Sequence, residues 1–145
     1  RGLAYEGLGR WEEAVKDYSE AIQLWGGSGN SFIPGDWSLG GRLGVNPYVL
    51  IYRGNALSRL GRYSDAVEDY QTAAEQFSAA QETRSCNIAL SNEALALFGA
   101  GDVDVAVQRM KSLLRKDAGN SDMHVALAAI YWNQGRSNFA KTEWE

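Results

Sequence analysis

One short motif that recurs four times constrains the fold more than any other feature of this sequence. In each copy a glycine is followed five residues later by an alanine, and the copies read LGRWEEA, LGRYSDA, AGDVDVA and QGRSNFA. Their alanines, Ala14, Ala66, Ala106 and Ala140, are 52, 40 and 34 residues apart. Self-similarity at a spacing near 34 residues is typical of arrays of helical hairpins, and insertions account for the longer intervals.

Each copy of the motif lies between two segments whose apolar residues follow the helical period of 3.6 residues. In the second unit the apolar residues before the glycine are Tyr48, Ile51, Tyr52, Leu57 and Leu60, and those after it are Tyr63, Ala66, Val67, Tyr70, Ala73, Ala74 and Phe77. Gly61 fits the position just past a helix end, where a left-handed backbone is favoured. The pattern predicts an all-α chain with helices at residues 1–8, 11–24, 47–60, 63–78, 83–99, 102–116, 121–134 and 137–145.

Small residues alternate with aromatic ones inside each predicted hairpin. We expect Gly54 and Ala66 to lie where the two antiparallel helices cross, since a small side chain lets the backbones approach. The aromatic residues then fill the wider gaps around the crossing. One such hairpin cannot bury its apolar face alone, but stacked hairpins share a continuous core.

The same positions are occupied in all four units. The first unit has Gly2, Tyr5, Gly9, Trp11, Ala14, Tyr18 and Ala21, and the second has Gly54, Leu57, Gly61, Tyr63, Ala66, Tyr70 and Ala73. The third has Ala94, Leu97, Gly101, Val103, Ala106, Met110 and Leu113, and the fourth has Ala128, Tyr131, Gly135, Ala140 and Trp144. These residues resemble the tetratricopeptide repeat family, although the proline that usually follows the second helix is absent from every unit. The resemblance implies a single domain over residues 1–145, an α-solenoid of about three and a half units wound as a right-handed superhelix.

A glycine-rich insertion, residues 25–46, separates the first two units. Loops of this length are uncommon in compact domains and are either functional or disordered. The insertion nevertheless carries large apolar residues that are costly to leave in water, among them Phe32, Ile33, Trp37, Leu39 and Leu43. Three interpretations stay open: a loop packed on the solenoid, a loop that lines or caps a groove for a partner, and a disordered segment.

The sequence lacks the usual signatures of catalysis and of cofactor binding. Neither G-x-x-x-x-G-K-[ST] nor G-x-G-x-x-G occurs, so the glycine-rich insertion does not predict a nucleotide site. Cys86 is the only cysteine and His124 the only histidine, and they fall on different predicted hairpins. We expect an inert, buried thiol and a packed or hydrogen-bonded histidine. We therefore expect no enzyme activity, no cofactor and no metal.

Charge and hydropathy narrow the range of partners. The formal net charge is −4, and nucleic-acid binding needs a basic face, so we expect no nucleic-acid partner. No apolar run approaches the ~20 residues of a membrane span. The chain begins at Arg1, and both ends fall within helical patterns, so we expect it to be a piece of a longer protein.

The resemblance implies a binding surface, because in this family the first helices of the hairpins line a concave groove that often holds an extended peptide. The residues expected to bind a partner there are Tyr48, Ile51, Asn55, Arg59, Leu95, Phe98, Val125 and Trp132. The expected lining also includes Leu3, Glu6, Ser58, Ile88, Ser91, Ala129 and Asn133. Tyr48, Phe98 and Trp132 have a second interpretation, in which they pack between neighbouring helices. One subset of the family grips acidic chaperone tails with lysine, arginine and asparagine, but only Asn55 matches that clamp and Ile51 stands at a lysine position. Chaperone-tail binding is therefore disfavoured.

These observations predict a non-enzymatic adaptor that holds a protein or peptide segment in the groove. The alternative is a structural spacer or self-association element whose partner is a second copy or the rest of its own chain. The segment NPYVLIYRGNALSRLGRY, which follows the insertion, resembles tetratricopeptide proteins of plant and algal plastids. That resemblance implies the plastid as an alternative location to the cytoplasm.

Overall fold

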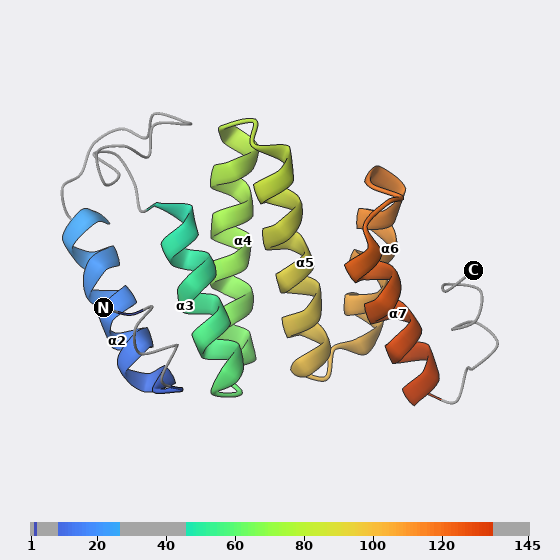
Figure 1. Ribbon diagram of the computed structural model, residues 1–145, viewed down its shortest axis with the longest axis horizontal. Helices are drawn as coiled ribbons and strands as arrows, with labels where there is room; N and C mark the ends of the chain where they lie inside the picture. The colour runs from blue at the N-terminus through green and yellow to red at the C-terminus, as the bar shows by residue number, and fades with distance from the viewer. Residues whose placement is uncertain (1, 3–8, 27–45, 135–145) are drawn as a thin grey trace.

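The fold is a row of α-helices that zigzags along the chain (Figure 1). The computed structural model describes Gly2, residues 9–26 and residues 46–134, and within these ranges it contains helices and no strand. The helices are α2 (Trp11–Gly26), α3 (Pro47–Arg59), α4 (Tyr63–Ala79), α5 (Thr83–Gly99), α6 (Val103–Lys116) and α7 (Ser121–Asn133). The predicted all-α helical-repeat solenoid is confirmed.

The helix boundaries agree closely with those predicted from the sequence. Helix α5 matches its predicted span, and the other described helices differ from theirs by one or two residues. The largest difference is at α2, which continues through Trp25 and Gly26 into the predicted insertion. The remaining part of the insertion, at 27–45, and the predicted helices at 1–8 and 137–145 lie outside the described residues, apart from Gly2, which is helical.

Helices that follow one another in the chain pack side by side. Contacts join α2 to α3, α3 to α4, α4 to α5, α5 to α6 and α6 to α7. Helices α3 and α5 also touch, although α4 lies between them in the sequence. The first helices of these two hairpins are therefore neighbours, as in a stacked hairpin array.

Left-handed residues end the helices at the tight turns. Gly61 has φ +77° and Gly101 has φ +95°, and the amides that follow them donate to carbonyls near the preceding helix ends. The Arg62 amide bonds to the Leu57 carbonyl at 2.9 Å, which is a Schellman-type ending. The turn between α4 and α5 has the same geometry but uses Gln81, at φ 60°, in place of glycine.

In two hairpins a glycine ahead of the turn faces a large side chain on the helix that follows the turn. A Cβ added to Gly54 would lie 2.7 Å from the ring of Tyr70, and one added to Gly2 would lie 2.6 Å from the ring of Tyr18. Gly54 is thus at the predicted close approach, with a ring rather than a backbone as its closest neighbour. Ala66 is completely buried in the core between α3, α4 and α5.

Candidate functional site

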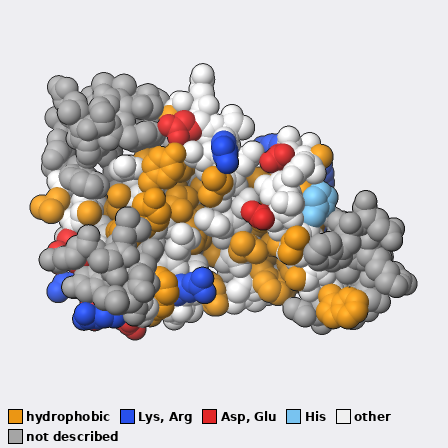
Figure 2. Space-filling model, in the orientation of Figure 1, with side chains coloured by type: hydrophobic (Ala, Val, Ile, Leu, Met, Phe, Trp, Pro, Cys, Tyr) orange, Lys and Arg blue, Asp and Glu red, His pale blue; other side chains and the backbone are white. Residues whose placement is uncertain are grey.

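The candidate site is the face formed by α3, α5 and α7, called here the first-helix face. Among the described residues, seven large hydrophobic side chains are exposed, and five of these belong to α3, α5 or α7. These five are Tyr48, Ile88, Leu95, Val125 and Trp132. Figure 2 shows apolar side chains over α3 and over the lower parts of α5 and α7 on this face.

A groove of about 430 Å³ opens between α3 and α5 on this face. It is called the α3–α5 groove and is lined by Trp11, Asn55, Ser58, Arg59, Tyr63, Tyr70, Asn92, Leu95 and Ala96. The structure thus brings together three residues that the sequence predicted for partner binding: Asn55, Arg59 and Leu95. The groove is mixed in character, with amide and hydroxyl groups beside an aliphatic wall.

Hydrogen bonds hold the polar side of the groove in place. The Tyr70 hydroxyl donates to Asn55 Oδ1 at 2.7 Å, and Ser58 Oγ lies 3.5 Å from the same hydroxyl. The Arg59 guanidinium lies over the ring of Trp11, 5.8 Å from its centre. This contact leaves Arg59 exposed while it fixes the cation at the rim of the groove.

Tyr48 lies near the start of α3 and is held against the turn between α4 and α5. Asn46 accepts a hydrogen bond from the Tyr48 amide at 2.9 Å and so caps the start of the helix. The Tyr48 hydroxyl pairs with Ser85 Oγ at 2.9 Å, and its ring meets Phe77 edge to face with centres 4.8 Å apart. Tyr48 therefore packs between neighbouring helices and still leaves 39% of its surface exposed.

Val125 and Trp132 are exposed on α7, by 46% and 65%. A separate recess of about 600 Å³ lies between the first half of α5 and the start of α7. Its lining is mainly polar and includes Arg84, Asn87 and Asp122, with Ile88 as its large aliphatic member. The exposed apolar side chains of α5 and α7 thus flank polar recesses and do not form one closed pocket.

Two of the predicted binding residues are placed differently. Ile51 is only 7% exposed and belongs to the core cluster that includes Ala73 and Phe77, so its assignment to the groove surface is wrong. The cause is packing against both α4 and α5, whose side chains share this core cluster with Ile51. Phe98 is half-buried and packs against the core cluster of α5, α6 and α7, which fits its packing interpretation.

Other predicted lining residues divide in the same way. Ser91 is buried, whereas Ile88 and Ala129 are exposed. Leu3 and Glu6 lie outside the described residues, as does the side chain of Asn133.

Sequence reasoning missed the contribution of the second helices to the groove. Trp11 of α2 and Tyr63 and Tyr70 of α4 line the α3–α5 groove. Asn92, on the first helix α5, was also missed. Trp11 and Tyr63 each come two residues after a turn glycine, Gly9 and Gly61. Their shared place at the start of a second helix was the available signal, because that end of the helix lies beside the groove.

The groups with catalytic potential are constrained by local contacts. Cys86 Sγ lies 3.5 Å from the Ala74 carbonyl, and burial raises the pKa of this thiol, which makes it less reactive. Cys86 is half-buried rather than fully buried as predicted. His124 Nε2 lies 3.0 Å from the Ala118 carbonyl, so the predicted hydrogen-bonded histidine is confirmed. Within the described ranges no three His, Cys, Asp or Glu side chains group in a way that would hold a metal ion.

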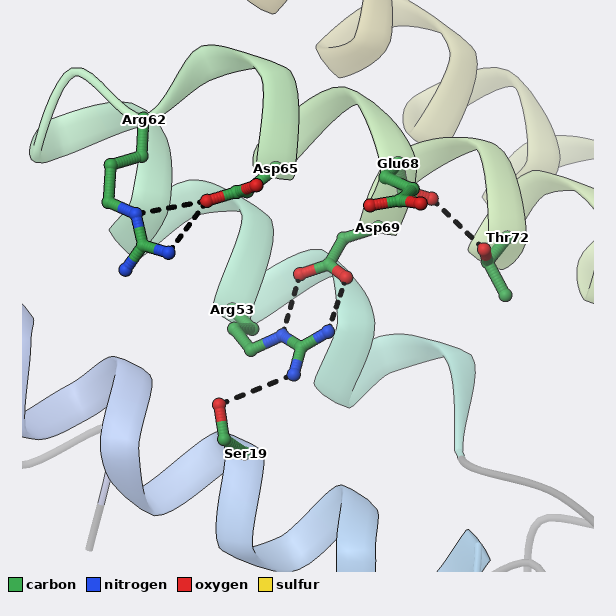
Figure 3. A network of polar contacts seen from close by, with 7 residues as sticks. All are labelled: Ser19, Arg53, Arg62, Asp65, Glu68, Asp69 and Thr72. Atoms are coloured by element: carbon green, nitrogen blue, oxygen red, sulfur yellow. Dashed lines mark hydrogen bonds and ion pairs between the residues drawn. The ribbon is translucent and has the colours of Figure 1, made fainter.

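A buried ion pair joins three helices behind this face. Arg53 donates two hydrogen bonds to Asp69, at 2.6 and 2.8 Å, and a third to Ser19 Oγ at 3.3 Å (Figure 3). The hydrogen bonds to Asp69 raise the pKa of Arg53. The side chains are 24% and 7% exposed, so the pair fixes α3 against both α2 and α4.

Comparison with protein families covers most of the chain. Three family models, each described as a tetratricopeptide repeat, match residues 1–28, 47–79 and 91–137. A search of curated proteins found no match. Across the described helices, none is long and apolar enough to cross a membrane.

Proposed function

Because the chain belongs to the tetratricopeptide repeat family, we propose that it is a non-enzymatic adaptor that holds a segment of a protein partner on the first-helix face. Repeats of this family are typically scaffolds that mediate protein–protein interaction. The finer part of the proposal concerns which face binds and what kind of segment it holds.

The observation that carries the proposal is the uneven distribution of exposed apolar side chains. Within the described residues, the first-helix face has five of the seven large exposed hydrophobics, whereas α2 and α6 contribute one each, Leu24 and Val105. Clustered apolar exposure on one face marks an interaction surface, whereas scattered single residues need no explanation. The 65% exposure of Trp132 also favours its role in partner binding over the interpretation in which it packs between helices.

The α3–α5 groove supports a segment with mixed anchors. Leu95, which is 44% exposed, offers an aliphatic contact for an apolar side chain of the partner. Asn55 is preorganised by Tyr70, and its amide is suited to a backbone group of an extended peptide. Arg59 at the rim would attract an acidic residue. We propose a peptide with an aliphatic or aromatic anchor and a neighbouring carboxylate as the ligand.

The proposal leaves acidic chaperone tails disfavoured as ligands. The family's clamp for such tails needs several cationic side chains, and the α3–α5 groove contains one, Arg59. Ile51, which stands at a clamp lysine position, is a buried core residue. A tail with several carboxylates would find too few positive partners in this groove.

Selection of short random peptides displayed on phage, followed by affinity measurement on the whole chain, tests the proposal. Val125→Asp and Leu95→Asp are expected to weaken binding of the selected peptides by about tenfold or more, because a charge replaces an anchor contact. Val105→Asp is the matched control, since Val105 is also 46% exposed but lies on α6. Equal loss in Val105→Asp and Val125→Asp would contradict the assignment of the face.

Sedimentation of the wild-type chain separates this function from the alternative of self-association. The adaptor proposal expects a chain that binds selected peptides as a monomer. A stable dimer that is broken by Val125→Asp, together with no selected peptide, would make the first-helix face a contact between copies instead.

A further inference from the structure

Two ion pairs, each with a buried carboxylate, occupy equivalent positions in successive hairpins. Arg53 directly precedes Gly54, and its partner Asp69 lies 16 residues later on α4. Glu93 directly precedes Ala94, the counterpart of Gly54, and its partner Arg109 also lies 16 residues later, on α6. Each pair therefore joins the same two positions of its own hairpin.

A third residue ties each pair to the preceding hairpin. Arg53 also donates to Ser19 of α2 at 3.3 Å, and Gln71 of α4 donates to Glu93 at 2.8 Å. Ser19 and Gln71 are again equivalent, since each comes five residues after the alanine of its own repeat. The same arrangement of three polar side chains thus occurs at two consecutive interfaces between hairpins.

The order of the charges is reversed between the two clusters. In the α3–α4 hairpin the cation lies on the first helix and the anion on the second, whereas in the α5–α6 hairpin the anion comes first. The carboxylates are the most buried members, with Asp69 7% and Glu93 1% exposed. Carboxylates at such depth are poorly screened by salt, so the sign of the charge that faces each of them affects packing strongly.

We infer that the reversed charge order specifies which helices pair as hairpins and excludes out-of-register stacking. Pairing α3 with α6 would place Arg53 against Arg109, and pairing α5 with α4 in hairpin geometry would place Glu93 against Asp69. The first mismatch brings two cations together, and the second buries two carboxylates against each other. If both hairpins had the same order, the mismatched pairs would attract as the native ones do.

The shapes of the side chains distinguish native from mismatched helix pairs less well than their charges do. Gly54 and Ala94 are both small, and the side chains 16 residues after them, Tyr70 and Met110, are both large and buried. Repeated units of similar shape are prone to misassembly during folding. The reversed order of the charges therefore distinguishes two hairpins whose side chains at these positions are otherwise similar in size.

Charge swaps in the whole chain test the inference. In Arg53→Glu with Asp69→Arg, the native pair is kept, but both hairpins now have the anion first. On dilution from denaturant we expect a slow, trapped phase with an amplitude about threefold or more above that of the wild type. Glu93→Arg with Arg109→Glu puts the cation first in both hairpins, and we expect the same increase in the trapped phase. The inference can therefore still be tested if one of the two variants fails to fold.

The variant that carries all four substitutions is the matched control. It restores opposite charge orders while it changes every position, so its trapped phase is expected to return to the wild-type amplitude. Slow steps from Pro34 and Pro47 are common to all variants and cancel in the comparison. Wild-type refolding in the two double variants, or equal trapping in the fourfold variant, would overturn the inference.

Discussion

The α3–α4 and α5–α6 hairpins use different side chains at the equivalent positions where their two helices pack together. In the first, Gly54 leaves room for the Tyr70 ring, and Arg53 holds Asp69 with two hydrogen bonds at 2.6 and 2.8 Å. In the second, Ala94 stands in the position of Gly54, Met110 in that of Tyr70, and the nearest contact between Arg109 and Glu93 is 3.7 Å.

The difference shows that packing in these hairpins depends on the combined size of two facing side chains more than on the identity of either one. A smaller residue on the first helix accompanies a larger one on the second, so the two helices stay close in both hairpins. The polar pair varies more freely, from a tight bidentate contact to a longer and more exposed one. Changes that break one member of a pair are therefore expected to affect the α3–α4 hairpin more.

The largest expected contrast concerns the two arginines. Arg53→Met leaves Asp69 buried without its counter-charge and is expected to lower the free energy of unfolding by about 3 kcal/mol. Arg109→Met is expected to cost less than about 1 kcal/mol, because the Arg109 side chain is 53% exposed and its contact is longer. Urea titration of both variants measures the contrast, and equal losses would mean that the two pairs are energetically alike.

The next contrast concerns the pairing of side-chain sizes. Gly54→Ala drives a methyl group into the Tyr70 ring and is expected to cost about 2 kcal/mol. Adding Tyr70→Met copies the Ala94 and Met110 pair of the α5–α6 hairpin and is expected to recover about 1 kcal/mol. A double-mutant cycle by chemical denaturation measures the recovery, and additive losses would show that the two positions are independent.

A smaller effect is expected at the turns. Gln81 adopts the left-handed backbone that glycine adopts at Gly61 and Gly101. Gln81→Gly is therefore expected to raise the free energy of unfolding by about 0.5 kcal/mol, and Gly61→Gln to lower it by about 1 kcal/mol. Thermal melting of the two variants compares the turns. Destabilisation by Gln81→Gly would mean that the Gln81 side chain supplies more than the strained backbone costs.

The smallest expected effect is a pH dependence. Cys86 stands eight residues before Ala94, where the α3–α4 hairpin has Asn46. Burial raises the pKa of the folded Cys86 thiol, so the unfolded chain releases its proton first as the pH rises. The contribution of the Cys86 thiol to the free energy of unfolding is fully present below its pKa in the unfolded chain. This contribution is lost as the pH rises through the pKa of the thiol in the folded chain. Stability is expected to fall more steeply above pH ~8.5 in the wild type than in Cys86→Ala, as denaturant titrations at several pH values measure. Equal slopes of stability against pH in the wild type and in Cys86→Ala would contradict a raised pKa of the Cys86 thiol in the folded chain.

Much of the fold was predictable because the strongest signals are local. Turn glycines such as Gly61 and Gly101 end helices whatever surrounds them, and the 3.6-residue pattern locates the helices between. The turn at Gln81 left no such signal, because its left-handed backbone is stabilised by its neighbours and not by the residue type. The boundary of α5 was still placed correctly from the apolar pattern that begins after it.

The candidate site was less predictable than the fold. Asn55, Arg59 and Leu95 were expected on one surface and do line one groove. Ile51 was misplaced because periodicity identifies the apolar side of a helix but not which neighbour covers it. Trp11 was missed because it reaches the groove from the preceding hairpin, and such a contact depends on the stacking angle between hairpins, which has no local signature.

The walls of the α3–α5 groove come from three successive hairpins, with Trp11 on α2, Tyr63 on α4 and Leu95 on α5. Its width is therefore set by the bend between hairpins and not by any single one of them. Tension that straightens the array would pull these walls apart, and a segment held between them would resist that extension. Any segment bound in this groove would therefore have to fit the bend of the array and not only the surface of one hairpin.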